Sequence, residues 1–297
     1  MKSTPLIFVI AFAALSASWG GFVLAPQLQL GHAVQTNMLG SGALYPPAPT
    51  GLAHQGADVY RANGCVYCHS QQAGQDGTHC EIVLTDLGTN AAAALAVLAK
   101  FGITNQSPSL PETVTRIPAA DVAAPILKEF TTAGAKAEVH IVPFGPDIAR
   151  GWGKRRSVAQ DYLYDYPVQL GARRAGPDLS NIGMRQPDVN WHLRHLYAPE
   201  TEVKGSMMPP YRYLFEVRKI GREPSPDALQ LPPEAAPPAG YEVVPKTEAV
   251  ALATYLANLR ADAPLYEAPT TPVFAAPPAT NAPAETTNAP AATAAAK

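Results

Sequence analysis

The sequence predicts a mainly α-helical protein that carries one N-terminal membrane helix and is interrupted by a small α/β module. Three observations lead to this prediction. An uncharged apolar run fills residues 5–26, residues 73–148 alternate strand-like and helix-like segments, and helix candidates lie on both sides of that stretch. The 31 prolines, gathered in particular stretches, indicate loops and linkers, and the net charge of -2 gives no reason to expect a nucleic-acid partner.

The apolar run predicts a membrane anchor over residues 1–26, because about 20 apolar residues cross a hydrocarbon core of about 30 Å. A cleaved secretory signal is the alternative, since residues 14–18 are small enough for a cleavage site. Lys2 is the only charge before the run, and the next charge is Asp58. This positive-inside bias leaves the N-terminus in the cytoplasm. Either alternative places the rest of the chain outside the cytoplasm.

The remaining chain divides into segments of different composition. Residues 27–54 are rich in Gly, Pro and Ala and predict an extended linker. Residues 263–297 are mostly Ala, Pro and Thr and predict a disordered tail. The hydrophobic patterns between them predict helices at 58–64, 90–101, 108–117, 121–133, 191–196 and 248–259, and strands at 81–84 and 137–142. Gly64 and Gly134 are suited to end the helices that they follow.

The string Cys65-Val66-Tyr67-Cys68-His69 carries the chemistry. Two thiols at this spacing reach the two vinyl groups of one haem, and the adjacent histidine then lies under the iron. The alternatives are a structural zinc half-site, which wants a second ligand pair, and a redox C-x-x-C, which has a different context. Covalent attachment of haem is performed outside the cytoplasm, in agreement with export. We therefore predict one haem c, and Cys80 is left without a role.

A second axial ligand decides between an electron carrier and a catalyst, because a thioether closes the iron whereas an open position binds ligands. Met208, directly before Pro209, is the predicted ligand, and its neighbour Met207 is the competitor. Met184 and Met38 are interpreted as packing or surface residues.

Residues around the haem are also predicted. The carbonyl of Pro177 is suited to accept the ring N–H of His69, although Gly176-Pro177 would equally form a plain turn. Three side chains are candidates to contact the haem propionates or else to be solvated: Arg173, Arg174 and Trp152.

Two histidines, His192 and His195, lie one helical turn apart and could bind a metal. Exposed helix histidines are the commoner interpretation, so no second metal site is predicted.

With these motifs in order, the chain resembles the membrane-anchored monohaem subunit, subunit II, of cbb3-type cytochrome c oxidase. Besides the anchor, the resemblance covers residues 56–72, 164–179, 191–196 and 206–211. It implies that Met208 is the sixth ligand. It also implies that the haem relays electrons from a cytochrome c donor, either a further cytochrome c subunit or a soluble one, to the catalytic haem-copper subunit.

The stretch from residue 73 to 148 departs from that family. Residues 81–90 and 127–139 resemble, more weakly, the C-terminal domain of the bacterial ribosomal stalk protein. The basic helix of that domain is replaced here by alanines around residues 91–100. The resemblance therefore implies only a fold, an α/β insert, and no ribosomal role.

The predicted fold class is thus a class I-like cytochrome c domain, formed by residues 55–72 and 149–262, that is interrupted by the module 73–148 and tethered by one helix. We expect it on the periplasmic side of a bacterial inner membrane. Oxygen reduction is assigned to a partner, because this chain lacks the multiple spanning helices and histidines that a haem-copper centre requires. The alternatives are a monohaem subunit of a nitric oxide reductase and a haem-based sensor or peroxidase with an open sixth site.

Overall fold

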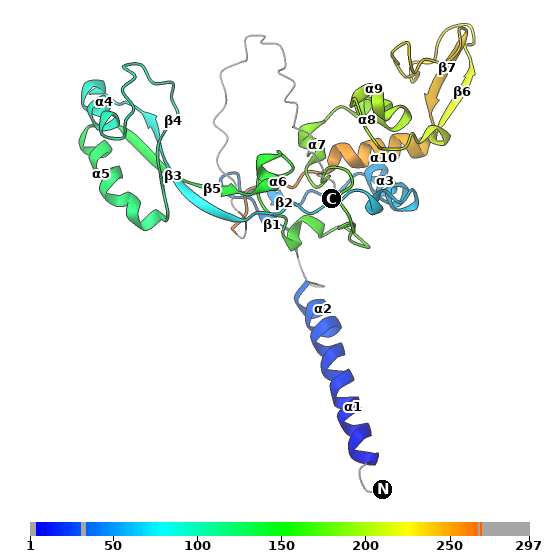
Figure 1. Ribbon diagram of the computed structural model, residues 1–297, viewed down its shortest axis with the longest axis horizontal. Coiled ribbons are helices and arrows are strands. Elements are labelled where there is room, and N and C mark those ends of the chain that lie inside the picture. Colours follow the sequence, from blue (N-terminus) through cyan, green and yellow to red (C-terminus); the bar gives the residue numbers. More distant parts are fainter. Residues whose placement is uncertain (1–3, 31–33, 267, 269–297) are drawn as a thin grey trace, which may run out of the picture.

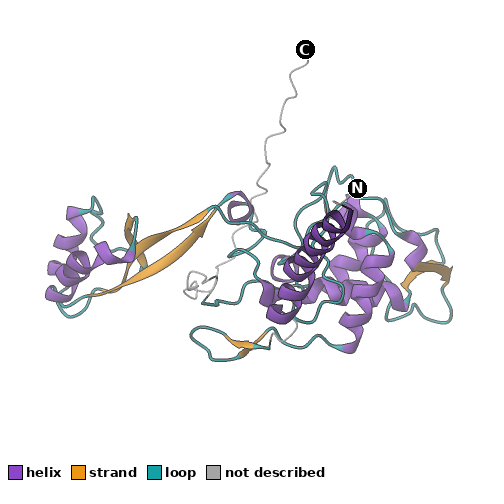
Figure 2. Cartoon of the chain, turned by 90° about the horizontal axis from the view of Figure 1, so that it is seen from below, coloured by secondary structure: helices purple, strands orange, loops and turns teal. Residues whose placement is uncertain are grey.

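A computed structural model describes residues 4–30, 34–266 and 268. An N-terminal helix projects away from the rest of the molecule, while a helical part and an α/β part extend to opposite sides above it (Figure 1). In the view from below, the long strands of the α/β part again extend away from the helical part, and the helices of the α/β part lie at the far end of these strands (Figure 2). The α/β part therefore contacts the helical part only near one end.

The N-terminal segment is helical from Thr4 to Leu30, as α1 (Thr4–Trp19), a π-helical turn (Gly20–Leu24) and α2 (Ala25–Leu30). Its apolar stretch, Pro5–Gln29, has 25 residues and a mean hydropathy of 2.1, and within the described residues it alone is long and apolar enough to cross a membrane. None of this stretch is buried by the rest of the chain. Apolar side chains such as Phe12 and Phe22 are therefore open to a bilayer. The predicted membrane helix is confirmed as a candidate span.

The predicted linker has more structure than expected. A short hairpin joins β1 (Thr36–Asn37) to β2 (Leu44–Tyr45), and α3 (Gly51–Ala62) begins inside the predicted extended region. The Thr50 hydroxyl accepts a hydrogen bond from the Ala53 amide at 3.3 Å and caps α3. The prediction of an extended chain over residues 27–54 was wrong here, because composition alone did not reveal this cap.

Three helices form the core of the helical part: α3, α8 (Val189–Tyr197) and α10 (Thr247–Asn258). Short helices α7 (Ile182–Arg185) and α9 (Pro199–Glu202) flank α8. The α3–α10 crossing is tight, because a Cβ at Gly56 would lie 2.0 Å from the Ala251 carbonyl oxygen. Glycine is therefore required at this crossing.

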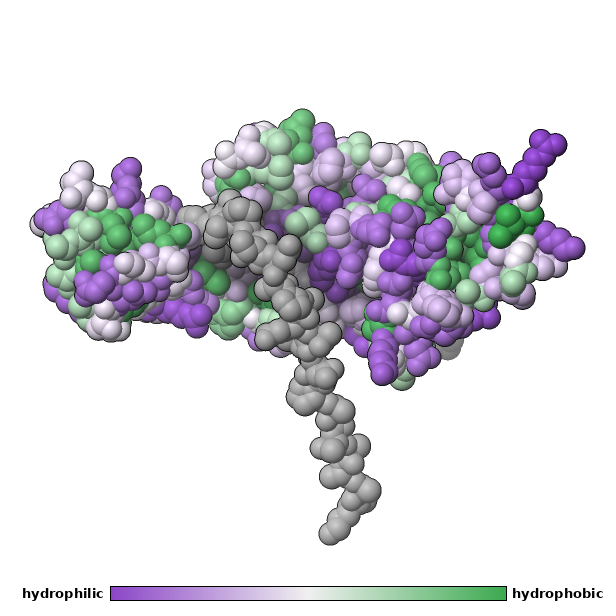
Figure 3. Space-filling model, turned by 90° about the horizontal axis from the view of Figure 1, so that it is seen from above, coloured by the Kyte–Doolittle hydropathy of each residue, from purple (hydrophilic) through white to green (hydrophobic). Residues whose placement is uncertain are grey.

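A hairpin of β6 (Phe215–Lys219) and β7 (Tyr241–Pro245) extends from this part, and the sequence analysis did not predict it. Its strands are joined by a long connection, residues 220–240, rather than by the two-residue turn that marks a hairpin in a sequence. The face seen from above is largely hydrophilic with smaller apolar patches, in contrast to the apolar α1 (Figure 3).

The α/β part is a three-stranded antiparallel sheet with β3 (Gly77–Asp86) between β4 (Glu112–Ile117) and β5 (Lys136–Phe144). Helices α4 (Ala91–Lys100) and α5 (Ala124–Thr132) pack with the sheet around their own core. That core includes Cys80, Ile82, Leu84, Leu98 and Phe130. A short helix, α6 (Pro146–Ala149), leads back to the helical part.

Most predicted elements of the α/β part are present, but the helix predicted at 108–117 was wrong. Residues 112–117 form β4, which pairs with β3 from Cys80 to Leu84. Thr113, Thr115 and Ile117 are β-branched, and such residues fit a pleated strand better than a helix. Gly134 ends α5 with a positive φ of 78°, as predicted.

The two cores share no residue among those described, which predicts that they respond separately to mutation. Phe130 is fully buried in the α/β core, so Phe130→Ala should cost about 3–5 kcal/mol there. Hydrogen exchange should rise across β3–β5 while α3, α8 and α10 stay protected. Val122→Ala, at a side chain that is 44% exposed, is the control. Equal loss of protection in both parts would contradict the separation.

The predicted tail begins later than residue 263. Ala263 and Leu265 are buried against Tyr45, with Leu265 fully inaccessible. The buried Arg155 reinforces this contact, because its Nε donates to the Ala263 carbonyl at 2.5 Å and its Nη2 donates to Asp161 at 2.7 Å. The disorder prediction was therefore wrong for these residues. The predicted tail also includes residues 267 and 269–297, which lie outside the described residues.

Candidate haem site

The Cys65–His69 string follows directly from the end of α3. The helix stops at Ala62, and Gly64 takes a left-handed conformation with φ of 70° that starts a 3-10 turn over Cys65–Tyr67. The His69 amide donates to the Cys65 carbonyl at 2.9 Å. Glycine tolerates this φ at no steric cost, which is the role predicted for Gly64. The string is thus one compact turn with its three reactive side chains at fixed spacing.

The two thiols of the string are free and differ in environment. Cys65 is buried in the core of the helical part, whereas Cys68 is exposed. Burial raises the pKa of the Cys65 thiol to about 11, and a hydrogen bond with Tyr211 opposes that rise. The two thiols are not joined to each other, so both are available to a third group.

His69 is held in the orientation of a ligand. Its Nδ1 lies 2.8 Å from the Pro177 carbonyl oxygen, so the Nδ1–H donates there and the Nε2 lone pair is left for another partner. Burial lowers the pKa of His69, which favours the neutral imidazole that binds metals. The hydrogen bond predicted for Pro177 is therefore present.

Gly176 makes this contact possible, because a Cβ at this position would lie 2.3 Å from His69 Cε1. We expect Gly176→Ala to displace the ring, break the bond to Pro177 and weaken axial ligation. The measurement is the fraction of low-spin haem in the visible spectrum, which should fall at least several-fold. Gly221→Ala is the control, since nothing lies within 4 Å of a Cβ there. An unchanged spectrum for Gly176→Ala would contradict the expected role of the glycine.

The two neighbouring methionines have different surroundings. Met207 is 89% exposed, whereas Met208 is partly buried and packs on the core that contains Cys65. Tyr211 packs on the same core, and its amide donates to the Leu196 carbonyl at 2.8 Å, which holds the loop against α8. This arrangement supports Met208 over Met207 as a ligand.

The structure separates the side chains predicted to contact propionates. Arg174 is already engaged by the protein, with Nε donating to Ser70 Oγ and Nη1 to Asp147, both at 2.9 Å. Its Nη2 donates to the Gln72 carbonyl, and its guanidinium lies 5.6 Å from the Trp152 ring centroid. Arg174 thus braces the chain beside the string, and Arg173 is exposed.

Asp178 was missed by the sequence analysis and is central to the site. It is fully buried and accepts hydrogen bonds from Ser70 Oγ at 2.5 Å and from the Gln72 amide at 2.8 Å. Its other oxygen accepts from the amide and hydroxyl of Ser180. Asp178 therefore ties the Cys-His string to the Gly176–Pro177 segment. Its position right after Gly-Pro was the available sequence signal.

The histidines of α8 are more buried than predicted. His192 is 3% exposed, and its Nε2 lies 2.8 Å from the Gln186 carbonyl oxygen. The His195 ring stacks on Trp191 at 4.8 Å, and burial together with the nearby His192 lowers the pKa of His195 to about 4. The interpretation as exposed histidines was wrong. Over the described residues, no group of three or more His, Cys, Asp or Glu side chains is placed to hold a metal ion.

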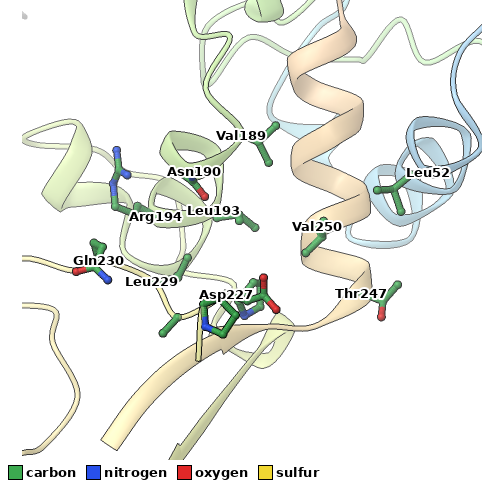
Figure 4. A pocket seen from close by; sticks show the side chains of 13 residues that line it. Leu52, Val189, Asn190, Leu193, Arg194, Asp227, Leu229, Gln230, Thr247 and Val250 are labelled. Carbon is green, nitrogen blue, oxygen red and sulfur yellow. The ribbon is translucent and has the colours of Figure 1, made fainter. Parts of the chain in front are cut away.

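A separate groove of about 730 Å³ lies where α8 faces α10 and the end of β7 (Figure 4). Leu193, Leu229 and Val250 give it an apolar lining, and Asp227 and Arg194 add charge. Cys65, His69 and Met208 are not among the residues that line it. The groove is therefore not the predicted haem site.

Part of the candidate site lies in a segment that matches a known protein family. Residues 138–231 match a family model described as Cytochrome C oxidase, mono-heme subunit/FixO. This is the family that the sequence resembles. The match covers about a third of the chain and includes Pro177, Arg185 and Met208, while Cys65–His69 lies outside it. No curated protein matches the chain.

The family match leaves out most of the α/β module. It begins inside β5, so most of the predicted insert 73–148 lies outside it. The resemblance to the ribosomal stalk domain has no support from these comparisons and stays a prediction. The role of the insert and the bounds of the cytochrome c domain also stay predictions.

The residues of the site fit a covalently bound haem. Two free thiols and an oriented neutral imidazole are in one turn, and the glycine at 176 leaves room for that imidazole. These donors, with a thioether from Met208, are those that hold haem in c-type cytochromes. A bound haem would take up and release one electron reversibly.

Proposed function

We propose that this chain is a membrane-anchored monohaem c-type cytochrome that passes electrons to the catalytic subunit of a cbb3-type haem-copper oxidase. The carrying observation is the 2.8 Å contact between His69 Nδ1 and the Pro177 carbonyl oxygen. It joins the Cys-x-x-Cys-His string to a segment that matches the mono-haem oxidase family. Two parts of the chain far apart in sequence thus meet at one predicted haem site.

Each proposed ligand has a distinct task. Cys65 and Cys68 would attach the haem through thioether bonds, and His69 and Met208 would ligate the iron. The Pro177 carbonyl fixes the tautomer and orientation of His69, which keeps the Nε2 lone pair available. A thioether opposite the imidazole raises the reduction potential and closes the iron to ligands. Such a centre suits electron transfer better than catalysis.

The anchor supports the proposed location. Its apolar helix extends away from the helical part, so that part can sit at the membrane surface (Figure 1). With Lys2 on the cytoplasmic side, the haem lies on the periplasmic side of a bacterial inner membrane. There a cytochrome c donor, either soluble or a further subunit, would reduce it.

Purification of the full chain from its native membrane, through a tag placed after residue 297, tests the proposal. We expect a mass increase equal to one haem, sharp visible bands after reduction, and copurification of a copper-containing oxidase core. Carbon monoxide should not bind this haem. Copurification with a non-haem-iron nitric oxide reductase would overturn the oxidase assignment, and rapid carbon monoxide binding would instead indicate a sensor or peroxidase. Absence of covalent haem would overturn the proposal as a whole.

A further inference from the structure

Arg185, the last residue of α7, is a half-buried cation beside the candidate haem site. One of its terminal nitrogens donates to the backbone carbonyl of Asp178. Its Nε is buried and has no hydrogen-bond partner among the described residues. A buried N–H without a partner destabilises the fold, and the cost is larger on a charged group. The position of this nitrogen therefore requires an explanation.

The nearest carboxylate cannot supply the missing partner. Asp178 already accepts four hydrogen bonds, from Ser70, the Gln72 amide and both donors of Ser180. Arg174 also lies 3.8 Å from that carboxylate. Burial lowers the pKa of Arg185, and the attraction of Asp178 only opposes this. A partly buried guanidinium with an unused donor and no carboxylate hydrogen-bonded to it is suited to bind an external anion.

Arg185 is also close to the predicted iron ligand. The carbonyl that Arg185 contacts belongs to the residue after Pro177, which orients His69. Arg185 and the candidate ligand His69 thus both contact the backbone carbonyls of the same short segment, Pro177–Asp178.

The other arginines nearby do not offer the same site. Arg174 directs its Nε and both terminal nitrogens to Ser70, Asp147 and the Gln72 carbonyl. Arg173 is exposed, where an ion pair contributes at most about 1 kcal/mol. Among these three arginines, Arg185 alone has a side-chain nitrogen that is both buried and without a hydrogen-bond partner in the described part of the chain.

We propose that Arg185 binds a haem propionate, with its Nε–H donating to the carboxylate. This inference rests on the proposed haem function and adds a residue that the sequence analysis did not select. The propionate would accept a hydrogen bond from the unpaired Nε–H and neutralise the partly buried cation. In return, the positive charge would favour the ferrous over the ferric haem and raise the reduction potential.

The test compares midpoint potentials of the full-length protein with those of R185Q, R185K and R173Q. For R185Q we expect the equilibrium constant for reduction to fall about tenfold, which is about 59 mV for one electron. R185K keeps the charge and should recover most of the wild-type value. R173Q, the matched control at an exposed arginine, should stay within error. A fall in R173Q but not in R185Q would overturn the proposal.

A measurement on the wild-type protein tests the proposal even if the R185Q variant does not fold. In protein labelled with ¹⁵N-arginine, one Nε–H should exchange slowly and show a paramagnetic shift in the ferric state. Absence of such a signal from a haem-containing sample would overturn the assignment of Arg185. If the wild-type sample contains no covalent haem, the proposed function itself fails, so the two failures are distinguishable.

Discussion

Replacing Cys65 and Cys68 together by serine is expected to abolish covalent haem attachment. The thiols are the only groups of the string that form thioether bonds to the vinyl carbons, and serine hydroxyls do not replace them. Without that attachment the site loses its cofactor and the turn between α3 and His69 loses its main contact partner. We expect no haem-stained band on a denaturing gel and at least a hundredfold loss of electron transfer to the oxidase.

The remaining cysteine provides the matched control. Cys80 is free and buried in the core of the α/β module, away from the string. Cys80→Ser introduces a hydroxyl into that core, so it should lower the stability of the module but leave the haem band unchanged. Haem staining that survives in the double variant, or disappears in Cys80→Ser, would contradict the assignment of the two thiols.

The second large effect is expected for Met208→Ala. Loss of the thioether should remove the near-infrared sulfur-to-iron band and lower the reduction potential, because the ligand that stabilises the ferrous iron is gone. An open sixth position should then bind carbon monoxide, which we expect the wild-type protein to exclude. The near-infrared spectrum of the ferric protein and the carbon monoxide difference spectrum of the ferrous protein are the two measurements.

Met207→Ala is the control, since the Met207 side chain is 89% exposed and its removal leaves the core unchanged. It should keep the sulfur-to-iron band and stay closed to carbon monoxide. The opposite pair of results would make Met207 the ligand. If neither variant changed the spectrum, the sixth ligand would have to come from another residue.

The local elements of the site could be predicted because their signals are contiguous in the chain. The Cys-x-x-Cys-His string, Gly64 and the apolar run of residues 5–26 each carry their physical meaning within a few neighbouring residues. The His69–Pro177 hydrogen bond was also predictable, since a ligating histidine needs an acceptor for its second ring nitrogen. Helix predictions succeeded where the apolar period was sustained, as in α10.

Pairings between distant segments were decided by the tertiary structure. Arg174 and Arg185 are both arginines near the Gly-Pro segment, and their sequence neighbours do not say which is occupied. In the folded chain, Arg174 donates hydrogen bonds to Ser70, Asp147 and Gln72, whereas Arg185 Nε has no hydrogen-bond partner among the described residues. Composition did not distinguish these roles, because a hydrogen bond depends on which groups folding brings within about 3 Å.

The sequence by itself therefore determined the candidate membrane span, the Cys-x-x-Cys-His string and the chemical identity of the proposed ligands. The tertiary structure alone decided that His192 is buried, that residues 112–117 form a strand beside β3, and that Asp178 ties the string to its acceptor. The physical reason is the separation in sequence over which each kind of interaction acts. Motifs and apolar periods act between neighbours, whereas burial, strand pairing and satisfaction of buried charges depend on residues that are as far as 215 positions apart.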